Sequence, residues 1–291
     1  MANLKDLKTR ISSVKSTQKI TKAMKMVAAS KLRRAQDRAE AARPYSTKME
    51  NVLSTLASNV SKENAPELLV GRAQNKTHLV IVITSDRGLC GGLNTSVIKA
   101  VRAKAKEVDL AGKSLKVVAV GKKGYEQLKH GLGGLIASYV DTSSRKVPEY
   151  EDAESAAHDA IKLFKEGEVD SCSVIYNKFQ SAIAQVVTTQ NLIPLEIPNK
   201  EEKAKDDSVY DYEPEEEKIL AELLPLNIAV QIYHAMLENA ASEHGSRMTA
   251  MDNATRNAGE MIKDLSLVYN RTRQAAITTE LTEIVAGAEA L

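Results

Sequence analysis

The sequence predicts an α/β protein in which two very long terminal helices form a coiled coil and a Rossmann-like α/β domain lies between them. The chain has 291 residues, of which only 4% are aromatic, so it lacks the large rings that fill the cores of small β-rich domains. No glycine precedes Gly71 and no proline follows Pro225. Between these two points, short β-branched runs alternate with helical stretches, which is typical of a βαβ domain.

The first helix is expected from Asn3 to about Ser58, because Pro44 is the only helix-breaking residue in that range. We expect the helix to bend near Pro44. Its apolar residues follow a heptad spacing that then continues in a shifted register: Leu4, Leu7, Ile11 and Val14, followed by Met24, Val27, Leu32 and Ala35. An apolar stripe of this kind needs a partner to cover it.

The second long helix is expected after Pro225, because no further proline interrupts the chain. Its seam positions alternate steps of three and four: Met248, Met251, Thr255, Ala258, Ile262, Leu265, Tyr269, Thr272, Ala276 and Thr279. Half of these residues are Thr or Ala, so the seam is weakly hydrophobic and suits a helix that moves against a partner. We assign residues 1–60 and 218–291 to one coiled-coil shaft.

The middle of the chain, residues 70–200, is predicted to form the α/β domain. Five β-branched runs are candidate strands: Leu79 to Thr84, Lys116 to Val120, Leu135 to Val140, Ser173 to Tyr176 and Gln185 to Thr189. Helical stretches are expected at about 93–109, 122–130 and 151–166, and this alternation predicts a mostly parallel sheet. Residues 200–217 hold nine acidic and three basic side chains, and we expect them to form a linker or an exposed foot.

The charge of the chain is uneven although its net value is only +2. Residues 1–50 hold 13 Lys and Arg against 4 Asp and Glu, so the first helix could meet nucleic acid, anionic lipid or an acidic protein, or could simply be solvated. A coiled-coil nucleic-acid-binding protein is one alternative. Such a protein should show aromatic residues beside the basic ones, and Tyr45 is the only aromatic residue in residues 1–60.

A glycine-rich turn, Ser85 to Asn94, follows the first strand and precedes a helix, where α/β proteins often bind phosphate. A nucleotide-binding α/β enzyme is therefore a second alternative. The spacing matches neither GxGxxG nor a P-loop, which favours a structural turn in which Gly88, Gly91 and Gly92 supply unusual backbone angles. Cys90 in this turn is either a reactive thiol or, more simply, a small packing residue.

No arrangement of residues predicts an active site, a cofactor site or a metal site. Cys90 and Cys172 are far apart, the five histidines are scattered, and no His-Glu-x-x-His motif occurs. The first ten residues show no secretory signal, and no apolar run is long enough to cross a bilayer, so we expect a cytosolic location.

Three separated stretches together resemble the gamma subunit of rotary ATP synthases: Ile20 to Leu32, Ser85 to Asn94 and Tyr269 to Leu281. The resemblance covers essentially the whole chain. It implies an antiparallel coiled coil that penetrates a hexameric head of alternating alpha and beta subunits, with the α/β domain beside the epsilon subunit and on the membrane c ring. The protein would then be the central rotor shaft of a proton-driven synthase and would catalyse nothing by itself.

The resemblance also implies which residues bind partners. They are Lys22, Met24, Lys25 and Met26 on the first helix and Arg273, Gln274, Thr278 and Glu280 near the end of the chain. The simpler interpretation of these side chains is a solvated face. Because the chain has neither the paired-cysteine insertion of plastid members nor a transit peptide, we expect a bacterial protein, peripheral on the cytoplasmic face of the inner membrane.

Overall fold

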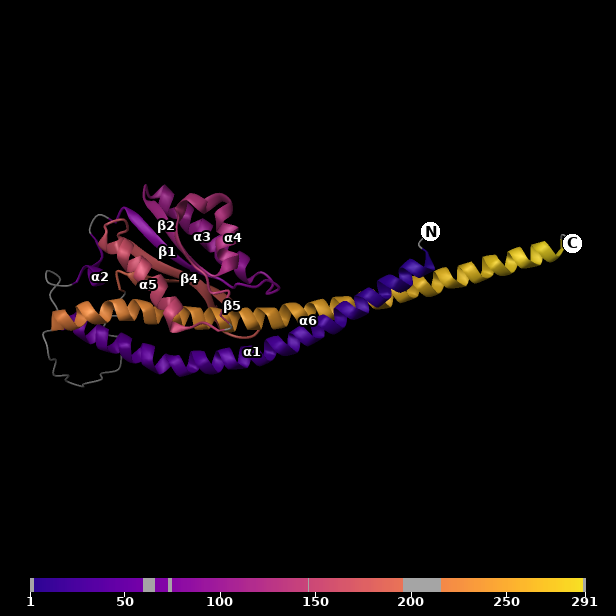
Figure 1. The fold of residues 1–291 in the computed structure, drawn as a ribbon, viewed down its shortest axis with the longest axis horizontal. Coiled ribbons are helices and arrows are strands. Elements are labelled where there is room, and N and C mark those ends of the chain that lie inside the picture. The colour runs from indigo at the N-terminus through magenta and orange to yellow at the C-terminus, as the bar shows by residue number, and fades with distance from the viewer. Residues whose placement is uncertain (1–2, 60–65, 73–74, 146, 196–215, 290–291) are drawn as a thin grey trace. The chain divides into compact units, whose positions relative to one another are not determined.

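The computed structural model describes residues 3–59, 66–72, 75–145, 147–195 and 216–289, and it confirms the predicted fold class (Figure 1). Its elements are α1 (Leu4–Asn59), α2 (Glu67–Val70), β1 (Thr77–Ile83), α3 (Leu93–Leu110), β2 (Ser114–Val120), α4 (Lys122–Leu132), a 3₁₀ turn η1 (Gly133–Leu135), β3 (Ile136–Val140), α5 (Tyr150–Lys165), β4 (Ser171–Phe179), β5 (Gln185–Ile193) and α6 (Glu216–Glu289). All five strands and the three inner helices occur where they were predicted. The predicted foot falls almost entirely on residues 196–215, which lie outside the described residues.

The five strands form one sheet in the order β3-β2-β1-β4-β5. The first four strands are parallel, and β5 pairs antiparallel with β4, so the sheet is mostly parallel as expected. Alternate residues of the central strand β1 point to opposite faces. Leu79, Ile81 and Ile83 pack with α5 and α6, and Val80 and Val82 pack with α3 and α4. Both faces are covered, which explains the continuous apolar run.

The chain divides into two compact units, and both long helices contribute to each of them. One unit holds residues 1–29 and 247–291, and the other holds residues 30–246 with the sheet. The assignment of residues 1–60 and 218–291 to one shaft, made from the sequence, stays a prediction.

Helix α6 begins at Glu216 rather than after Pro225, which corrects the sequence-based start. Leu220 and Leu224 are 0% and 2% exposed and pack against Met49, Leu53 and Leu56 of α1. Burial of such a side chain contributes about 1.5–3 kcal/mol, so two of them offset the roughly 3 kcal/mol cost of a proline inside a helix. Helix α1 likewise continues through Pro44.

The inward-facing side chains of α1 follow one uninterrupted heptad, so the predicted register shift is wrong. The positions are Leu4, Leu7, Ile11, Val14, Gln18, Thr21, Lys25, Ala28, Leu32, Ala35, Ala39, Ala42, Ser46, Met49, Leu53 and Leu56. Val27, which the shifted register placed inside, is 57% exposed. The prediction failed because three consecutive inward positions are polar: Gln18, Thr21 and Lys25. A heptad assigned from apolar residues alone passes over these positions and continues on the apolar residues beside them.

Within the terminal unit, α1 and α6 run antiparallel. Thr21 Oγ1 lies 2.7 Å from Thr255 Oγ1, and Lys25 Nζ lies 2.6 Å from Asp252 Oδ1, so residue numbers fall on α6 as they rise on α1. Nine of the ten predicted seam positions on α6 are buried or half-buried, and Thr279 is exposed. The same pairing places Leu4, the first residue of α1, near residue 272 of α6. The C-terminal part of α6 therefore extends beyond the described part of α1.

An 18-residue window of α6 reaches a mean hydropathy of 1.3, enough to meet the length and composition of a membrane span. The sequence offered no unbroken apolar run of that length. Of that window, 56% is buried inside the protein. Packing against the sheet and α1 therefore accounts for much of the apolar surface.

Candidate functional site: the terminal coil and the glycine turn

The end of α6 presents an apolar stripe to solvent. Ile277, Leu281, Ile284 and Val285 are 52%, 61%, 72% and 49% exposed, and their spacing of four, seven and eight residues places them on one helical face. An exposed apolar face of this kind marks a surface that binds a partner. The stripe was not singled out from the sequence, although its spacing could have revealed it.

The predicted residues at this end lie around that stripe and are all exposed: Arg273, Gln274, Thr278 and Glu280. The Thr278 hydroxyl donates a hydrogen bond back to the Gln274 carbonyl at 2.9 Å. This bond lies within α6, and the side chains of Arg273 and Glu280 are exposed to solvent.

The second predicted group, on α1, divides into two pairs. Lys22 and Met26 face outward, and Met26 is 62% exposed. Met24 is half-buried, and Lys25 lies on the seam, where its ammonium group pairs with Asp252 and lowers the pKa of that carboxyl. The structure therefore brings Lys22 and Met26 to the surface and assigns Lys25 to the coiled coil.

The two predicted groups do not form one site. Asp252 marks the level of Lys25 on α6, and Arg273 lies 21 positions further along the same helix. At 1.5 Å per residue, this places the two groups roughly 30 Å apart. A single partner that contacts both groups must therefore extend over this distance, or different parts of a larger assembly must contact each group.

The glycine turn has two residues with left-handed backbone angles, Leu89 at φ +63° and Gly91 at φ +58°. Of the three predicted turn glycines, only Gly91 is required for that reason, since Gly88 and Gly92 have no positive φ. A side chain at either of those two positions would meet open space. The expectation that all three supply unusual angles is therefore wrong for Gly88 and Gly92, and Leu89 was missed.

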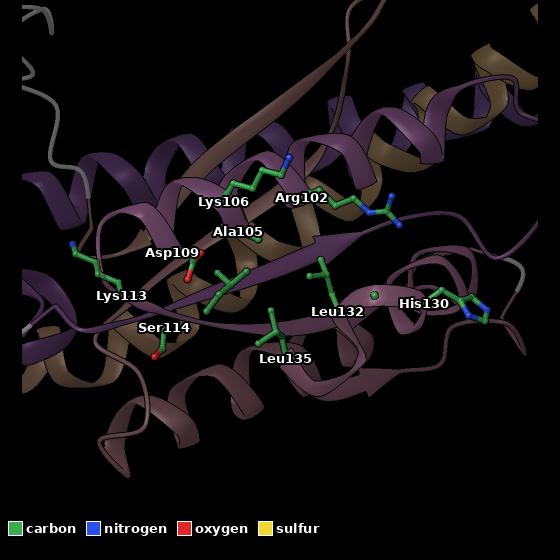
Figure 2. Close-up of a pocket in the computed structure, with 11 residues that line it drawn as sticks. Arg102, Ala105, Lys106, Asp109, Lys113, Ser114, His130, Leu132 and Leu135 are labelled. Atoms are coloured by element: carbon green, nitrogen blue, oxygen red, sulfur yellow. The ribbon is translucent and has the colours of Figure 1, made fainter.

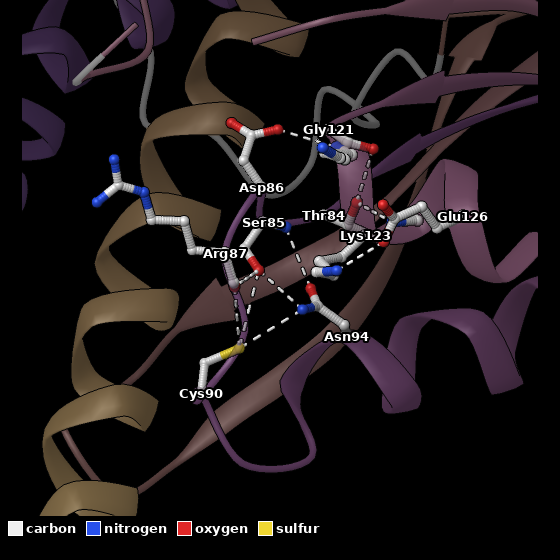
Figure 3. A network of polar contacts seen from close by, with 11 residues as sticks. Thr84, Ser85, Asp86, Arg87, Cys90, Asn94, Gly121, Lys123 and Glu126 are labelled. Carbon is white, nitrogen blue, oxygen red and sulfur yellow. Dashed lines mark hydrogen bonds and ion pairs between the residues drawn. The ribbon is translucent and has the colours of Figure 1, made fainter. Parts of the chain in front are cut away.

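Asn94 holds the glycine turn closed (Figure 3). Its Oδ1 accepts a hydrogen bond from Ser85 N–H at 3.1 Å, and its Nδ2 donates to Ser85 Oγ at 2.7 Å. Cys90 is 2% exposed, and its carbonyl accepts a hydrogen bond from Ser246 Oγ on α6 at 2.6 Å. The turn thus acts as a packing element, with its cysteine buried.

The N-terminus of the neighbouring helix α4, which is not the helix that follows the glycine turn, is capped by the protein's own groups (Figure 3). Asp86 Oδ1 accepts Lys122 N–H at 2.8 Å, and Thr84 Oγ1 accepts Gly124 N–H at 2.8 Å. A carboxylate at this position takes the place of a bound anion. A Cβ at Gly121 would lie 2.3 Å from the Thr84 carbonyl oxygen, so glycine is essential at that position for close approach, a requirement that sequence analysis missed.

A polar junction joins α6 to β4, and no spacing along the chain indicated it. The Ser242 hydroxyl donates to the Asn177 carbonyl at 2.9 Å, and Asn177 Nδ2 donates to Asn239 Oδ1 at 3.3 Å. Glu238, whose side chain is 5% exposed, accepts Phe179 N–H at 2.9 Å. Buried bonds of this kind fix the register of the helix against the strand.

The buried carboxylate of Glu238 also has basic neighbours. Arg43 Nη2 lies 3.9 Å and His234 Nε2 lies 3.8 Å from its Oε1. Burial, together with the charge of Glu238, raises the pKa of Tyr176 to about 12. Among the described residues, no group of three or more His, Cys, Asp or Glu side chains is placed to hold a metal ion.

Comparison with known proteins identifies the family. A family model described as ATP synthase matches residues 3–291. The chain is 55% identical to the ATP synthase gamma chain of Pelagibacter ubique (strain HTCC1062) over 292 residues and 52% identical to that of Rhodospirillum rubrum over 299 residues, covering 100% of each chain in both cases.

Solved structures show the same fold. The chain is similar to one from the central stalk and c ring of the Tetrahymena thermophila mitochondrial ATP synthase, with 31% identity and a TM-score of 0.60 over 81% of this chain and 99% of that one. It also matches a chain of the Euglena gracilis mitochondrial ATP synthase rotor with a TM-score of 0.65 over 94% and 98%, where 20% identity shows the fold alone. The chain belongs to the ATP synthase gamma-chain family.

Proposed function

We propose that this chain is the central rotor shaft of a bacterial, proton-driven ATP synthase. It transmits rotation of the membrane c ring into sequential conformational changes in the catalytic beta subunits. The observation that carries the proposal is the exposed apolar stripe of α6, Ile277 to Val285, beyond the end of the described part of α1. A helix end with exposed apolar side chains of this kind is suited to a surrounding apolar surface supplied by other subunits.

The physical requirement for such a shaft is asymmetry. Three identical beta subunits can hold different affinities only if a partner without threefold symmetry contacts each of them differently. Two unlike helices satisfy this requirement. Their outward side chains differ, with Lys22 and Met26 on α1 and Arg273, Gln274, Thr278 and Glu280 on α6 as the proposed contacts to the alpha and beta subunits.

In this proposal, residues 1–60 and 218–291 act as the shaft, and the α/β domain, residues 70–200, meets the epsilon subunit and the c ring. Residues 200–217 form the foot. Rotation that enters through the α/β domain must reach α6, and the bonds from Asn177 and Phe179 to Asn239, Ser242 and Glu238 supply that connection. The complex then holds the chain at the cytoplasmic face of the inner membrane.

We propose further that the chain is not itself catalytic. The glycine turn supports this, because the Ser85 N–H, which a phosphate cradle would need, already donates to Asn94 Oδ1. Membership of the gamma-chain family disfavours the two alternatives raised by the sequence, a nucleic-acid-binding coiled coil and a nucleotide-binding enzyme.

A disulfide tether tests the rotary role. Met26→Cys, at an exposed position about halfway along α1, is crosslinked to a cysteine in a beta subunit of the assembled enzyme. We expect ATP hydrolysis and proton-driven synthesis to stop in proportion to crosslink yield and to return on reduction, because each turnover must carry this face past three beta subunits. Cys90 and Cys172 are 2% and 0% exposed and should not compete.

The matched control is Asp211→Cys, in the predicted foot, crosslinked to a c-subunit loop. Because the shaft and the c ring turn together, we expect this tether to leave coupled synthesis largely intact. Full activity with the Met26 tether in high yield would contradict a rotary role. Loss of activity with the Asp211 tether alone would place the moving contact at the opposite end of the chain.

A further inference from the structure

A cavity of about 690 Å³ opens on the α/β domain between the end of α3, the start of β2 and the end of α4 (Figure 2). Its volume is that of an ordinary small-ligand pocket. It lies on the α3 and α4 side of the sheet, whereas α5 and α6 pack on the opposite side. The cavity is therefore separate from the surfaces proposed above to bind the catalytic head.

Positive charge gathers along this cavity. Arg102 and Lys106 come from one face of α3, and Lys113 comes from the turn before β2, against a single lining carboxylate, Asp109. In the described part of the chain, none of the three cations has a carboxylate within ion-pair distance. Lys104 differs, because it pairs with Glu107 at 3.0 Å.

The spacing of Arg102 and Lys106 allows both side chains to bind one anion. They are four residues apart, so their side chains are neighbours on the helix, and like charges at that spacing destabilise a helix. An anion between them would remove that repulsion and accept charge-assisted hydrogen bonds from both. Figure 2 shows both side chains at the α3 wall of the cavity.

The opposite wall is mainly apolar, with His130 as its polar side chain. Leu132 and Leu135 are only half-buried, although both pack against the core cluster that contains Leu115. They follow a break in α4 at His130 and Gly131, where Gly131 has φ +108°. An apolar group in the cavity would cover these two leucines, and burial of such area is favourable by about 25 cal/mol per Å².

We propose that this cavity binds an amphiphilic anion. Its phosphate or carboxylate head lies between Arg102 and Lys106, with Lys113 adding positive potential, and its apolar tail lies against Leu132 and Leu135. The arrangement requires both parts of the ligand, because the cations lie on one wall and the exposed apolar surface lies on the other.

Calorimetric titration of the full chain with decyl phosphate, below its micelle concentration, tests the proposal. We expect saturable binding of one ligand per chain. Decyl maltoside, which keeps the tail without the charge, and inorganic phosphate, which keeps the charge without the tail, should each bind at least about tenfold more weakly. No saturable binding of decyl phosphate, or equal binding of decyl maltoside, would overturn the proposal.

Two variants of equal charge change locate the site. Arg102→Glu/Lys106→Glu should weaken decyl phosphate binding by at least about tenfold. Lys99→Glu/Lys129→Glu alters exposed lysines of α3 and α4 that do not line the cavity, and it should leave the affinity within about twofold. Equal loss in both variants would show a nonspecific charge effect and would contradict the assignment.

A labelling experiment on the unaltered chain provides a readout that does not depend on folding of a variant. A decyl phosphate that carries a tail diazirine should label peptides containing Leu132 and Leu135, and labelling elsewhere would contradict the site. Sedimentation with phosphatidylcholine vesicles that contain phosphatidic acid identifies the source. Binding that requires Arg102 and Lys106 indicates a membrane lipid, and labelling by the soluble probe alone indicates a soluble amphiphile.

Discussion

Two segments of the same helix, α6, have opposite environments. From 227 to 245 nearly every side chain is buried or half-buried, including polar residues such as Asn239 and Ser242, whereas from 277 to 288 every side chain is exposed. The first segment is held by its own chain, through β4 and the core of the α/β domain. The second segment has apolar side chains without partners among the described residues. One helix therefore combines a fixed anchor with a surface made for other subunits.

The difference lies in bonding as well as burial. In the buried segment, side-chain hydrogen bonds reach a different element of the fold, from Ser242 and Asn239 to Asn177. In the exposed segment, the hydroxyls of Thr278, Thr279 and Thr282 bond to carbonyls four residues earlier on α6 itself. Bonds of the first kind prevent the helix from rotating against the sheet, and bonds of the second kind leave the outer face free.

The largest expected effect comes from placing a charge in each segment. Ile232→Asp, at a side chain that is 0% exposed, should lower the free energy of unfolding by about 3–5 kcal/mol, because it buries an unpaired carboxylate. Leu281→Asp, at 61% exposure, should change it by less than about 0.5 kcal/mol. Thermal and denaturant unfolding of the full chain measure both.

The same two variants should also differ in their binding to the other subunits. Leu281→Asp should fold normally but bind the alpha and beta subunits more weakly, because its charge enters the proposed apolar surroundings. Copurification of the complex at increasing salt measures this. If Leu281→Asp destabilised the isolated chain as much as Ile232→Asp, the contrast between the two segments would be wrong.

Local patterns predicted most of the fold. The five β-branched runs and the alternating helices of the α/β domain were sufficient to place its strands, because a sheet covered on both faces requires continuous apolar runs. The seam of α6 was also predicted through Ala276. The seam of α1 was not, because polar residues such as Gln18 and Lys25 occupy it, and their burial depends on partners across the coil.

The site was less predictable for the same reason. The junction between Asn177 and Asn239 joins residues 62 positions apart, and no spacing along the chain indicates it. The need for glycine at Gly121 depends on the approach of Thr84 from another segment. Exposure of Lys22, Met26 and Arg273 agrees with partner binding.

Acid should distinguish the two units of the chain. The two ring nitrogens of His78 on β1 are hydrogen-bonded to the hydroxyls of Ser171 and Ser173, Nδ1 at 2.7 Å and Nε2 at 2.8 Å. Burial, with smaller effects from the positive charges of Lys104 and Lys113, lowers the pKa of His78 to about 4. Because the folded state binds the proton less tightly than the unfolded state, the contribution of His78 is complete above pH 6.5. It is lost as the pH falls towards 4.

The loss amounts to at most about 3 kcal/mol, and it should appear in the unit that contains the sheet. In the terminal unit, Asp252 has a lowered pKa, so its pairing with Lys25 persists through this range and is lost only at lower pH. Hydrogen exchange at pH 6.5, 5.5 and 4.5, corrected for the pH dependence of the intrinsic rate, should therefore show that protection falls more in β1 and β4 than in the coil. His78→Asn should remove most of this pH dependence, and an unchanged dependence in that variant would assign it to another group.

A smaller effect is expected midway between the two segments, on the half-buried seam. Ile262→Asp should cost about 1–2 kcal/mol, because its carboxylate can still reach water, and Ile262→Leu should cost less than about 1.5 kcal/mol. Thermal unfolding of both variants measures the difference. A cost for Ile262→Asp as large as that for Ile232→Asp would mean that the coil is more tightly closed than the half-buried seam indicates.

The smallest expected effect concerns a single hydroxyl in each segment. Ser242→Ala removes a buried hydrogen bond to the Asn177 carbonyl and should cost about 1–2 kcal/mol, because that carbonyl loses a partner where water does not reach. Thr278→Ala removes a hydroxyl that only bonds back to α6 at an exposed position, and alanine is the better helix former, so its effect should be near zero or slightly stabilising. Paired denaturant titrations of the two variants, with Ser242→Thr added to test whether a hydroxyl alone restores the bond, measure the difference. If Ser242→Ala unfolded at the same denaturant concentration as Thr278→Ala, the buried bonds would contribute little to holding α6 on β4, and apolar packing around Ile232 would be left as the main anchor of the shaft.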